Sequence, residues 1–546
     1  MKNRTDFAPA YQILTDMAER HPDLACLDFL GAKMTYGEVL SATRRAARGL
    51  QDLGIGPEMR VGLCLLNSPY YIIAYFATLM TGASVVNFNP LYTEAEIRAQ
   101  ITDSEIEVMF TLDMKQLYAK VASALHTTSL RTIVVCSLAD ALPPMKSILM
   151  QVFKRAEIAN VATDLGHVPF ALLLADGDEP QRIPIAPQTD IAVIQYTGGT
   201  TGTPKGAMLT HANISANTWQ VKTWLGETEP GTERMLCVIP FFHVFSMTAA
   251  MNLGLSIGAE LILVPRFELA QTLEIIHEKR PTLFPAVPTI FGAINGFAGL
   301  EQYDLTSIRY CISGGAPLPA EVKASFEEKS GCVLVEGYGL SEASPVVTCN
   351  PPHSEYRTGS IGLPLPRTEI EVRDQEHPWH VLSAGDHGEL VVRGPQVMAG
   401  YWRRPDETHD VIKGGWLHTG DIGYIDEDGY VFVTDRLKDI IICSGFKVFP
   451  RQVEDALYTH PDVFEAVVIG INDEYRGEAP MAFVTLKPGA GTNEDGLMKF
   501  CHETLNPIER PVAVEIRNEL PKTLIGKISK KELVAEQTTK REKHHA

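Results

Sequence analysis

The sequence lacks closely spaced cysteines. Its nine cysteines are scattered between Cys26 and Cys501, and no two of them have the C-x-x-C spacing that is common in zinc sites. Nine thiols cannot all pair within one chain, so free thiols in a reducing cytosol are the simplest interpretation. The cysteine pattern therefore predicts a cytoplasmic protein and argues against a zinc site.

Long apolar runs are also missing. The longest, YYIIAYFATLM at 70–80, is too short to span a bilayer as a helix. The first residues, MKNRTDFAPAYQIL, do not contain the apolar core of a signal peptide. We therefore expect neither a membrane-spanning helix nor a secretory leader.

Positive charge is scarce. The chain has 48 lysines and arginines against 67 aspartates and glutamates, a formal net charge of −19. This balance argues against a general nucleic-acid-binding protein, because contacts to phosphate need clustered Lys and Arg. Phosphorylated small ligands stay open, since a local site can be positive on an acidic protein. With 546 residues, 45% of them hydrophobic and 21% charged, the composition is typical of a globular protein with two or more domains.

A glycine-rich stretch, YTGGTTGTPKGAMLTH at 196–211, is the most informative part of the chain. The apolar run IAVIQ precedes it, and the segment ANISANTWQVKTWL that follows has the character of a helix. Strand, glycine-rich turn and helix in this order predict a phosphate-binding loop, because turn N–H groups and a helix N-terminus carry positive partial charge. The stretch is not the common P-loop, since Lys205 lies between Pro204 and Gly206. An ordinary glycine- and threonine-rich loop is the alternative interpretation.

Strands alternate with helices in the first part of the chain. The segments RVGLCLL (60–66) and SVVNFNP (84–90) have the composition of strands, and the segment between them, PYYIIAYFATLMTGA (69–83), that of a helix. This alternation predicts parallel β-α-β units and an α/β layered architecture.

The composition changes to short strands after Gly385, where DEDG at 426–429 is typical of a hairpin turn. A compact unit with strand, helix and strand patterns begins at Arg436. We therefore predict two domains, a large α/β domain at 1–435 and a small, mobile α+β domain at 436–546. The polar tail after Glu536 is expected to be frayed.

The segment 145–158, MKSILMQVFKRAEI, fits the strand–helix alternation poorly. Helical periodicity places an apolar face on it, made of Met145, Ile148, Leu149, Val152 and Phe153, with Lys146, Lys154 and Arg155 beside it. A basic amphipathic helix of this kind can lie on a membrane surface. The alternative is that the apolar face packs against the rest of the domain.

Two later stretches point to nucleotide chemistry when they are considered together with 196–211. EGYGLSEASP at 336–345 contains Ser341 and Glu342, and by itself it also fits a strand-to-helix turn capped by Ser341. GGWLHTGDIGYIDEDGYVFVTDRLKD spans 414–439. The three stretches resemble the signatures of the adenylate-forming, or AMP-binding, superfamily, and 414–439 is similar to the signature of its fatty-acyl-CoA synthetases.

The resemblance implies that the glycine-rich loop holds the β- and γ-phosphates of ATP. The implied contact residues are Thr197, Gly198, Gly199, Thr200, Thr201, Gly202, Thr203 and Lys205. The matching adenine site consists of Gly315, Ala316, Pro317, Glu336, Gly337, Tyr338 and Gly339, with the tyrosine stacking on the base.

The superfamily also implies roles for the residues that follow. Ser341 matches a hydroxyl residue that contacts the α-phosphate and the substrate carboxylate. Glu342 matches a Mg²⁺ ligand, with Thr197 as a second metal contact. This suits Mg²⁺, which binds through one or two carboxylates together with phosphate oxygens.

The last signatures concern the ribose and the catalytic lysine. Asp421 would accept hydrogen bonds from the ribose hydroxyls, as an ionised carboxylate does well. Arg436 would reach the ribose and phosphate region, and Lys438 matches the family's hinge position. LPKTLIGKISKKEL at 520–533 resembles the C-terminal motif whose catalytic lysine is Lys527 here, although it departs from the family pattern at the last basic position.

Two further elements of the resemblance concern the acyl group and its acceptor. The loop SGFKVFP carries Ser444, Gly445 and Phe446, which are implied in the second step of the reaction. His243, in PFFHVFS, matches a superfamily histidine near the acyl pocket. Because it lies between aromatic residues, a purely structural role is an equal alternative.

The resemblance implies an ATP-dependent fatty-acid–CoA ligase acting on a medium- to long-chain acid. The expected partners are a fatty acid, ATP, Mg²⁺ and coenzyme A, and no nucleic acid. The alternatives are an aryl or terpenoid acid as substrate, transfer to a carrier protein, and a non-catalytic lipid-binding regulator. A homodimer, and contact with the inner face of the membrane through 145–158, are further hypotheses.

Overall fold

The structure is a computed structural model and divides into two compact units. The described residues are 7–175, 179–197, 204–353, 356–437, 439–444, 446–473, 475–487, 489–522 and 528–545. The first unit consists of Met1–Tyr356, Pro364–Glu369 and Arg393–Leu417, and the second of Arg357–Leu363, Ile370–Val392 and His418–Ala546. The mixed α/β content and the large first and small second unit agree with the predicted fold class. A domain boundary at Asp435 stays a prediction.

One sheet of the first unit contains the strand that leads into the glycine-rich stretch. Its strand order is β19 (Gly400–Tyr401), β9 (Lys205–Thr210), β8 (Ile191–Thr197), β4 (Ser84–Asn87), β3 (Arg60–Cys64), β5 (Val108–Leu112), β6 (Thr132–Cys136) and β7 (His167–Pro169). Strands β8, β4, β3, β5, β6 and β7 run parallel to one another. β3, β4 and β5 are buried along nearly their whole length, as parallel strands between helices must be.

The second sheet of the first unit carries the predicted adenine segments. Its order is β16 (Leu363–Pro364), β15 (Val346–Cys349), β14 (Val333–Gly339), β13 (Tyr310–Ser313), β12 (Leu283–Ala286), β10 (Arg234–Cys237), β11 (Glu260–Leu263), β1 (Ala25–Phe29) and β2 (Ala32–Thr35). The strands from β14 to β1 are parallel, and β15 and β2 are antiparallel to their neighbours. The predicted β-α-β architecture is therefore confirmed in both sheets.

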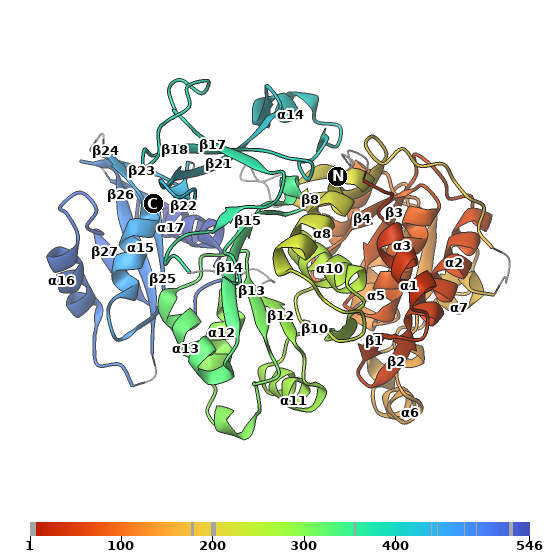
Figure 1. Ribbon diagram of the computed structural model, residues 1–546. Coiled ribbons are helices and arrows are strands. Elements are labelled where there is room, and N and C mark those ends of the chain that lie inside the picture. The colour runs from red at the N-terminus through yellow and green to blue at the C-terminus, as the bar shows by residue number, and fades with distance from the viewer. Residues whose placement is uncertain are drawn as a thin grey trace. The chain divides into compact units, whose positions relative to one another are not determined.

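Helices connect and cover these strands (Figure 1). They are α1 (Gln12–Arg20), α2 (Tyr36–Asp52), α3 (Pro69–Met80), α4 (Glu94–Ser104), α5 (Lys115–Ala122), α6 (Pro144–Phe153), α7 (Phe170–Leu173), α8 (His211–Leu225), α9 (Val244–Ser246), α10 (Leu253–Ser256), α11 (Leu269–Lys279), α12 (Pro288–Asn295), α13 (Ala320–Ser330) and α14 (Pro405–Val411). Single turns are η1 (Ala139–Ala141), η2 (Arg155–Glu157), η4 (Leu300–Gln302) and η5 (Ser341–Ala343), and η3 (Met247–Asn252) is a π-helix.

Local capping residues determine where these helices begin and end, and packing against neighbouring elements determines which of their faces are buried. At the start of α2 the Thr35 side chain accepts the N–H of Glu38, whose carboxylate accepts the N–H of Thr35, a capping box. The helix ends at Asp52, and Gly54 follows with a φ of +83°, which glycine adopts without strain. α3 is buried on nearly every side because it contacts α2 as well as β3 and β4. Each large apolar side chain so buried contributes about 1.5–3 kcal/mol.

The predicted strand before the glycine-rich stretch and the predicted helix after it are confirmed as β8 and α8, but the sequence did not predict a second strand between them. β8 is followed by a second strand, β9, which pairs with it in antiparallel register, Thr197 lying opposite Lys205. α8 begins only at His211, at the far end of this six-residue strand. Such a strand is about 20 Å long, so the N-terminus of α8 is remote from Lys205 at the start of β9. The helix dipole is therefore too distant to add positive charge at Lys205.

The second unit contains short strands and three helices among its described residues. One group of strands is β17 (Glu369–Arg373), β18 (Gly388–Arg393), β21 (Trp416–Ile425) and β22 (Val431–Arg436). The first two residues of β21, Trp416 and Leu417, belong to the first unit, where they pair with β20 (Ile412–Lys413). The other group is β24 (Phe446–Val448), β23 (Ile441–Cys443), β26 (Gly477–Leu486), β25 (Val463–Asp473) and β27 (Ala513–Ile516), with α15 (Pro450–Tyr458), α16 (Glu494–Thr504) and α17 (Lys530–His545). The predicted turn at 426–429 joins β21 to β22, the Gly429 N–H donating to the carbonyl of Asp426.

Two expectations about exposed segments are corrected. The tail after Glu536 is not frayed, because α17 continues to His545 and is anchored by buried Leu533 and by an ion pair between Glu536 and Arg517 at 2.8 Å. The apolar face of α6 does not pack against the domain, since its five side chains are 49–79% exposed. In the described part of the chain, no helix is long and apolar enough to cross a membrane.

Candidate functional site

The β8–β9 hairpin places the two ends of the glycine-rich loop side by side. Thr197 is the last residue of β8 and Lys205 the first of β9, and their cross-strand pairing brings the Thr197 hydroxyl to 3.5 Å from the Lys205 carbonyl. The predicted phosphate contacts Gly198, Gly199, Thr200, Thr201, Gly202 and Thr203 lie outside the described residues. The two described ends therefore define where the loop begins and returns.

A tyrosine links Lys205 to Glu342. The Lys205 ammonium lies 5.3 Å from the centre of the Tyr401 ring, a cation–π distance, and 3.1 Å from the Glu407 carboxylate. The Tyr401 hydroxyl donates to Glu342 Oε1 at 2.7 Å. Burial and the neighbouring Glu342 charge raise the pKa of Tyr401 well above its usual range, so the phenol stays a donor. Predicted phosphate and metal residues from distant segments thus meet around one side chain.

Glu342 and Ser341 lie in the short turn η5, directly after β14. The Met398 N–H donates to the Glu342 carbonyl, which fixes the turn against the segment that ends in Tyr401. Gly339 precedes this turn, and a Cβ at that position would clash with the carbonyl oxygen of Pro345. The glycine therefore allows the chain to fold back closely enough to present Glu342.

The predicted adenine segment is formed by the ends of two adjacent parallel strands. Gly315 follows β13 with a φ of +82°, and Ala316 and Pro317 complete the turn. Glu336, in the middle of β14, is buried, and its carboxylate accepts the N–H of Leu318 at 3.2 Å. Glu336 thus holds the turn in place. Gly337 and Tyr338 follow it in β14, where Tyr338 lies opposite Thr348 of β15.

His243 belongs to a loop that buried polar side chains hold from several elements. Asn67 donates to the carbonyls of Cys237 and Ile239, Tyr71 donates to the carbonyl of Phe241, and Gln195 to that of Phe242. The Nδ1 atom of His243 accepts the N–H of Phe245 at 3.3 Å. The proton of a neutral imidazole then resides on Nε2, which makes that nitrogen a donor. This arrangement fits both the structural and the acyl-site interpretation.

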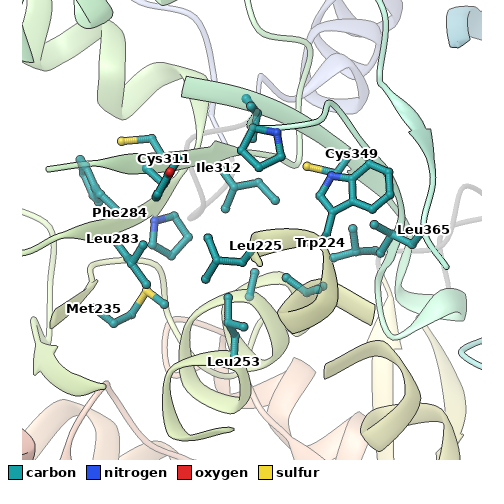
Figure 2. Close-up of a pocket in the computed structure, with 17 residues that line it drawn as sticks. Trp224, Leu225, Met235, Leu253, Leu283, Phe284, Cys311, Ile312, Cys349 and Leu365 are labelled. Atoms are coloured by element: carbon teal, nitrogen blue, oxygen red, sulfur yellow. The ribbon is translucent and has the colours of Figure 1, made fainter. Parts of the chain in front are cut away.

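An apolar pocket lies between the second sheet and the helices α8 and α10 (Figure 2). It contains about 550 Å³ of space that protein atoms do not fill, part of which is open to solvent. The lining residues are Val221, Trp224, Leu225, Met235, Ala249, Leu253, Leu283, Phe284, Pro285, Tyr310, Cys311, Ile312, Val335, Val346, Cys349, Pro352 and Leu365. Ile312 comes from β13, which leads into the adenine turn, and Val335 comes from β14, which contains Glu336. The pocket therefore adjoins the candidate nucleotide residues through shared strands.

In the second unit, Asp421 and Arg436 lie opposite each other on β21 and β22. The Arg436 Nε atom is 2.9 Å from Asp421 Oδ1, and the Asp421 side chain is buried. The sequence predicted both as ribose contacts, and the hairpin brings them together. Ser444 and Phe446 flank the turn between β23 and β24, where the Ser444 N–H donates to the carbonyl of Arg476. Lys438, Gly445 and Lys527 lie outside the described residues.

Sequence reasoning missed Tyr401 and Glu407. Their segment, GYWRRPDET at 400–408, carries no motif that singles out either residue. They reach the site because β19 pairs with β9, Tyr401 lying opposite Ala207. Only that long-range pairing could have indicated them.

The described residues contain no cluster of three His, Cys, Asp or Glu side chains arranged around a metal ion. A Mg²⁺ site built from one carboxylate and phosphate oxygens needs no such cluster. Within the described part of the chain, Glu342 Oε2 accepts no hydrogen bond, while Oε1 is held by Tyr401. The donor set therefore fits Mg²⁺ bound together with a nucleotide. All nine cysteines are free and buried.

Comparison with known proteins gives consistent results along the chain. Residues 14–402 match the family model of AMP-binding enzymes, and residues 452–527 match the AMP-binding enzyme C-terminal domain. A long-chain-fatty-acid–CoA ligase of Bacillus subtilis (strain 168) is 43% identical over 541 residues, 98% of this chain and 95% of the relative. The long-chain-fatty-acid–CoA ligase of Escherichia coli O157:H7 is 37% identical over 96% of this chain and 94% of the relative. The structure of ATP-bound MatB from Rhodopseudomonas palustris is similar with a TM-score of 0.83 and 27% identity, covering 97% of this chain and 99% of that chain.

Proposed function

The chain belongs to the family of AMP-binding enzymes, and from this premise we propose that it is an ATP-dependent fatty-acid–CoA ligase. It is an AMP-forming acid–thiol ligase, with ATP and coenzyme A as substrates. A carboxylate oxygen of the fatty acid attacks the α-phosphorus of ATP, and pyrophosphate leaves. The coenzyme A sulfur then bonds to the acyl carbon, AMP leaves, and the thiol proton passes to solvent.

The apolar pocket is the observation that supports a fatty acid. The side chains that Figure 2 labels converge on a space without a charged group, and each methylene moved there from water contributes about 0.8 kcal/mol. The strands β13 and β14, which line the pocket with Ile312 and Val335, also lead to Gly315 and contain Glu336. A fatty acid would lie with its tail among Leu253, Leu283 and Ile312 and its carboxylate toward the nucleotide.

In this proposal the residues around Tyr401 stabilise the phosphates of ATP. The Lys205 ammonium supplies positive charge where the β- and γ-phosphates lie, and Ser341 contacts the α-phosphate and the acid. Preorganised charge of this kind is the main way in which enzymes stabilise phosphoryl-transfer transition states. Glu342 and the Thr197 hydroxyl would hold Mg²⁺, which neutralises phosphate charge when bound. Tyr401 orients Glu342 for that role.

The second unit contributes the ribose contacts and the catalytic lysine. Asp421 accepts from the ribose hydroxyls while Arg436 fixes its orientation. Lys527 stabilises the charge that builds on the α-phosphate during adenylation. The loop at Ser444 and Phe446 acts in thioester formation, with Lys438 as the hinge between the two steps.

The test is a coupled thioester assay with ATP, Mg²⁺ and coenzyme A over straight-chain acids from butanoate to octadecanoate. We expect thioester formation to rise with chain length and benzoate to be a poor substrate, since it leaves most of the pocket empty. A preference for benzoate would favour an aryl acid instead. Acid-dependent ATP–pyrophosphate exchange without thioester would favour a carrier protein, and no exchange with any acid would favour a non-catalytic regulator.

The exposed helix α6 supports a second element of the proposal, contact with an anionic membrane surface. Its apolar face, Met145, Ile148, Leu149, Val152 and Phe153, is open to solvent, and Figure 1 shows α6 at the lower edge of the first unit. Lys154 and Arg155 lie at its end on a chain whose net charge is −19. A basic amphipathic helix binds anionic lipid through apolar burial and charge together. The enzyme would thereby act in the cytoplasm at the inner face of the membrane, where its apolar substrate is concentrated.

Vesicle flotation tests this contact. Wild type should bind vesicles of phosphatidylglycerol and phosphatidylcholine, and a chain with Ile148→Ser, Val152→Ser and Phe153→Ser should not. Trp379→Ser, which removes an exposed aromatic residue elsewhere, is the matched control and should bind. Equal binding of wild type and the triple variant contradicts the proposal. A homodimer that the triple variant abolishes, with no vesicle binding by wild type, would show that a second copy covers this face.

A further inference from the structure

We propose that Asp103 is a positioning residue for ATP, acting through Tyr196 and Arg404 on the two chain segments that carry the phosphate-binding side chains. This inference rests on the proposed nucleotide site. Asp103 lies at the end of α4, outside every signature in the sequence, and contacts none of the predicted ligand-binding residues that the structure describes.

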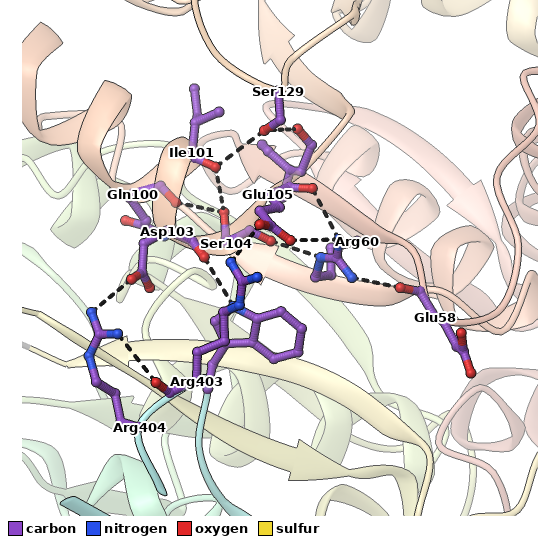
Figure 3. Close-up of polar contacts among 12 residues, drawn as sticks. Glu58, Arg60, Gln100, Ile101, Asp103, Ser104, Glu105, Ser129, Arg403 and Arg404 are labelled. Carbon is purple, nitrogen blue, oxygen red and sulfur yellow. Dashed lines mark hydrogen bonds and ion pairs between the residues drawn. The ribbon is translucent and has the colours of Figure 1, made fainter. Parts of the chain in front are cut away.

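The end of α4 is a point where several segments attach. The helix ends at Ser104, and Glu105 follows in the left-handed region with a φ of +53°. Arg60 donates to the carbonyls of Ser104 and Glu105, and the Trp402 indole N–H donates to the carbonyl of Asp103 at 3.0 Å (Figure 3). Helix C-termini carry negative partial charge that favours such donors. These contacts to backbone carbonyls therefore fix the end of the helix without any contribution from its own side chains.

The Asp103 carboxylate joins two donors from different parts of the chain. One oxygen accepts the Tyr196 hydroxyl at 2.5 Å, and the other accepts the Arg404 guanidinium at 2.9 Å (Figure 3 shows the second). The carboxylate is about one quarter exposed, and Tyr196 is buried. Burial, together with the bond to Asp103, raises the pKa of Tyr196 well above its usual range. The phenol is therefore a permanent donor, and both bonds are charge-assisted.

Each donor leads to one side of the candidate phosphate site. Tyr196 is followed at once by Thr197, where the glycine-rich loop begins. Arg404 lies between Tyr401, which holds Glu342, and Glu407, which holds Lys205. One carboxylate thus fixes the base of the loop relative to the segment that orients Glu342 and Lys205.

The geometry separates this role from a purely structural one. Asp103 lies away from the apolar pocket, whose lining it does not join. Losing it should therefore disturb the phosphates and leave the acyl group alone. A residue that only stabilised the fold would change both substrates together.

The experiment measures ATP–pyrophosphate exchange with hexadecanoate in the full-length chain. Asp103→Asn should raise the KM for ATP about tenfold, the size of one lost charge-assisted hydrogen bond, with an unchanged KM for hexadecanoate. Tyr196→Phe, which is nearly isosteric, should act in the same direction. The double variant should be no worse than Asp103→Asn alone, because Tyr196→Phe removes only the Tyr196–Asp103 bond, which Asp103→Asn already disturbs.

Glu105→Gln is the matched control. Glu105 lies on the same helix end and pairs with Arg403, but bonds neither Tyr196 nor Arg404, so its KM for ATP should equal that of wild type. The proposal is overturned if the Asp103→Asn and Tyr196→Phe chains keep the wild-type KM for ATP. It is also overturned if the KM for hexadecanoate rises as much as the KM for ATP, or if Glu105→Gln raises the KM for ATP equally. If the wild-type chain shows neither ATP–pyrophosphate exchange nor direct ATP binding, the proposed function itself is overturned. Failure of the proposed function is thus distinguished from failure of the Asp103 proposal alone.

Discussion

Two groups of candidate nucleotide residues are assembled in opposite ways. In the first unit Lys205, Tyr401 and Glu342 come from three separate segments and meet only because β19 pairs with β9 and η5 follows β14. In the second unit Asp421 and Arg436 are cross-strand neighbours in one hairpin. The first group is assembled by distant parts of the fold, whereas the ion pair of the second group helps to stabilise the hairpin that carries it. Function and stability should therefore separate in the first group and change together in the second.

The largest effect is expected for Glu342→Gln. The amide still accepts the Tyr401 hydroxyl, so the fold and melting temperature should stay as in wild type. The charge that would bind Mg²⁺ is lost, and kcat for adenylation should fall about 10²- to 10³-fold. ATP–pyrophosphate exchange over a Mg²⁺ titration, with a thermal melt of each sample, measures both. A large fall in melting temperature with little loss of activity would instead give Glu342 a structural role.

Asp421→Asn should affect activity and stability together. The substitution removes the charge that pairs with Arg436, whose guanidinium is 44% exposed and is partly compensated by water. We expect the unfolding free energy to fall by about 1–2 kcal/mol and the KM for ATP to rise about tenfold. Urea unfolding and exchange kinetics on the same preparation test this. A change in KM with no change in stability would remove the contrast between the two groups.

A smaller effect is expected for Tyr401→Phe. The ring stays over Lys205, and only the hydrogen bond to Glu342 is lost. We expect kcat/KM for ATP to fall about three- to tenfold, well short of the Glu342→Gln loss, with an unchanged KM for the fatty acid. Steady-state kinetics of both variants decide this. Equal losses in both variants would mean that Tyr401 does more than orient the carboxylate.

The smallest effect concerns stability against pH at the far end of the β8–β9 hairpin. Burial lowers the pKa of His211 to about 4, although Asp190 nearby opposes the shift, and its Nδ1 accepts the N–H of Ala10. The unfolded chain takes up a proton below pH 6.5 and the folded chain only near pH 4. Stability should therefore be full above pH 6.5 and fall by about 2–4 kcal/mol as the pH drops to 4. The unfolding free energy, measured by urea unfolding at several pH values, should depend less steeply on pH in His211→Gln than in wild type between pH 6.5 and 4. An equal pH dependence would contradict this assignment of the effect to His211.

The parts of the molecule that the sequence predicted are those encoded locally. The alternation of segments 60–66, 69–83 and 84–90 gave the β-α-β units because each element carries its own periodicity. Asp421 and Arg436 could be placed together because a hairpin turn separates them on one continuous motif.

What could not be predicted depends on long-range pairing. The strand β9 was taken as part of a turn because GAMLT is too short to show an alternating pattern, and it forms a strand only by pairing with β8. Tyr401, Glu407 and Asp103 gain their roles from contacts that no local pattern specifies. The apolar face of α6 could not be assigned either, since periodicity reveals a face but not what covers it.

The most direct measurement is the chain-length profile of ATP–pyrophosphate exchange in wild type and in Ala249→Leu. Ala249 is fully buried and lines the apolar pocket, so the larger side chain fills space that a long acyl chain needs. Ala249→Ser, which keeps the volume, is the control. The account predicts that Ala249→Leu lowers kcat/KM for hexadecanoate at least about tenfold relative to octanoate, while Ala249→Ser keeps the wild-type ratio. An unchanged ratio in a folded Ala249→Leu chain would contradict a fatty acid in this pocket.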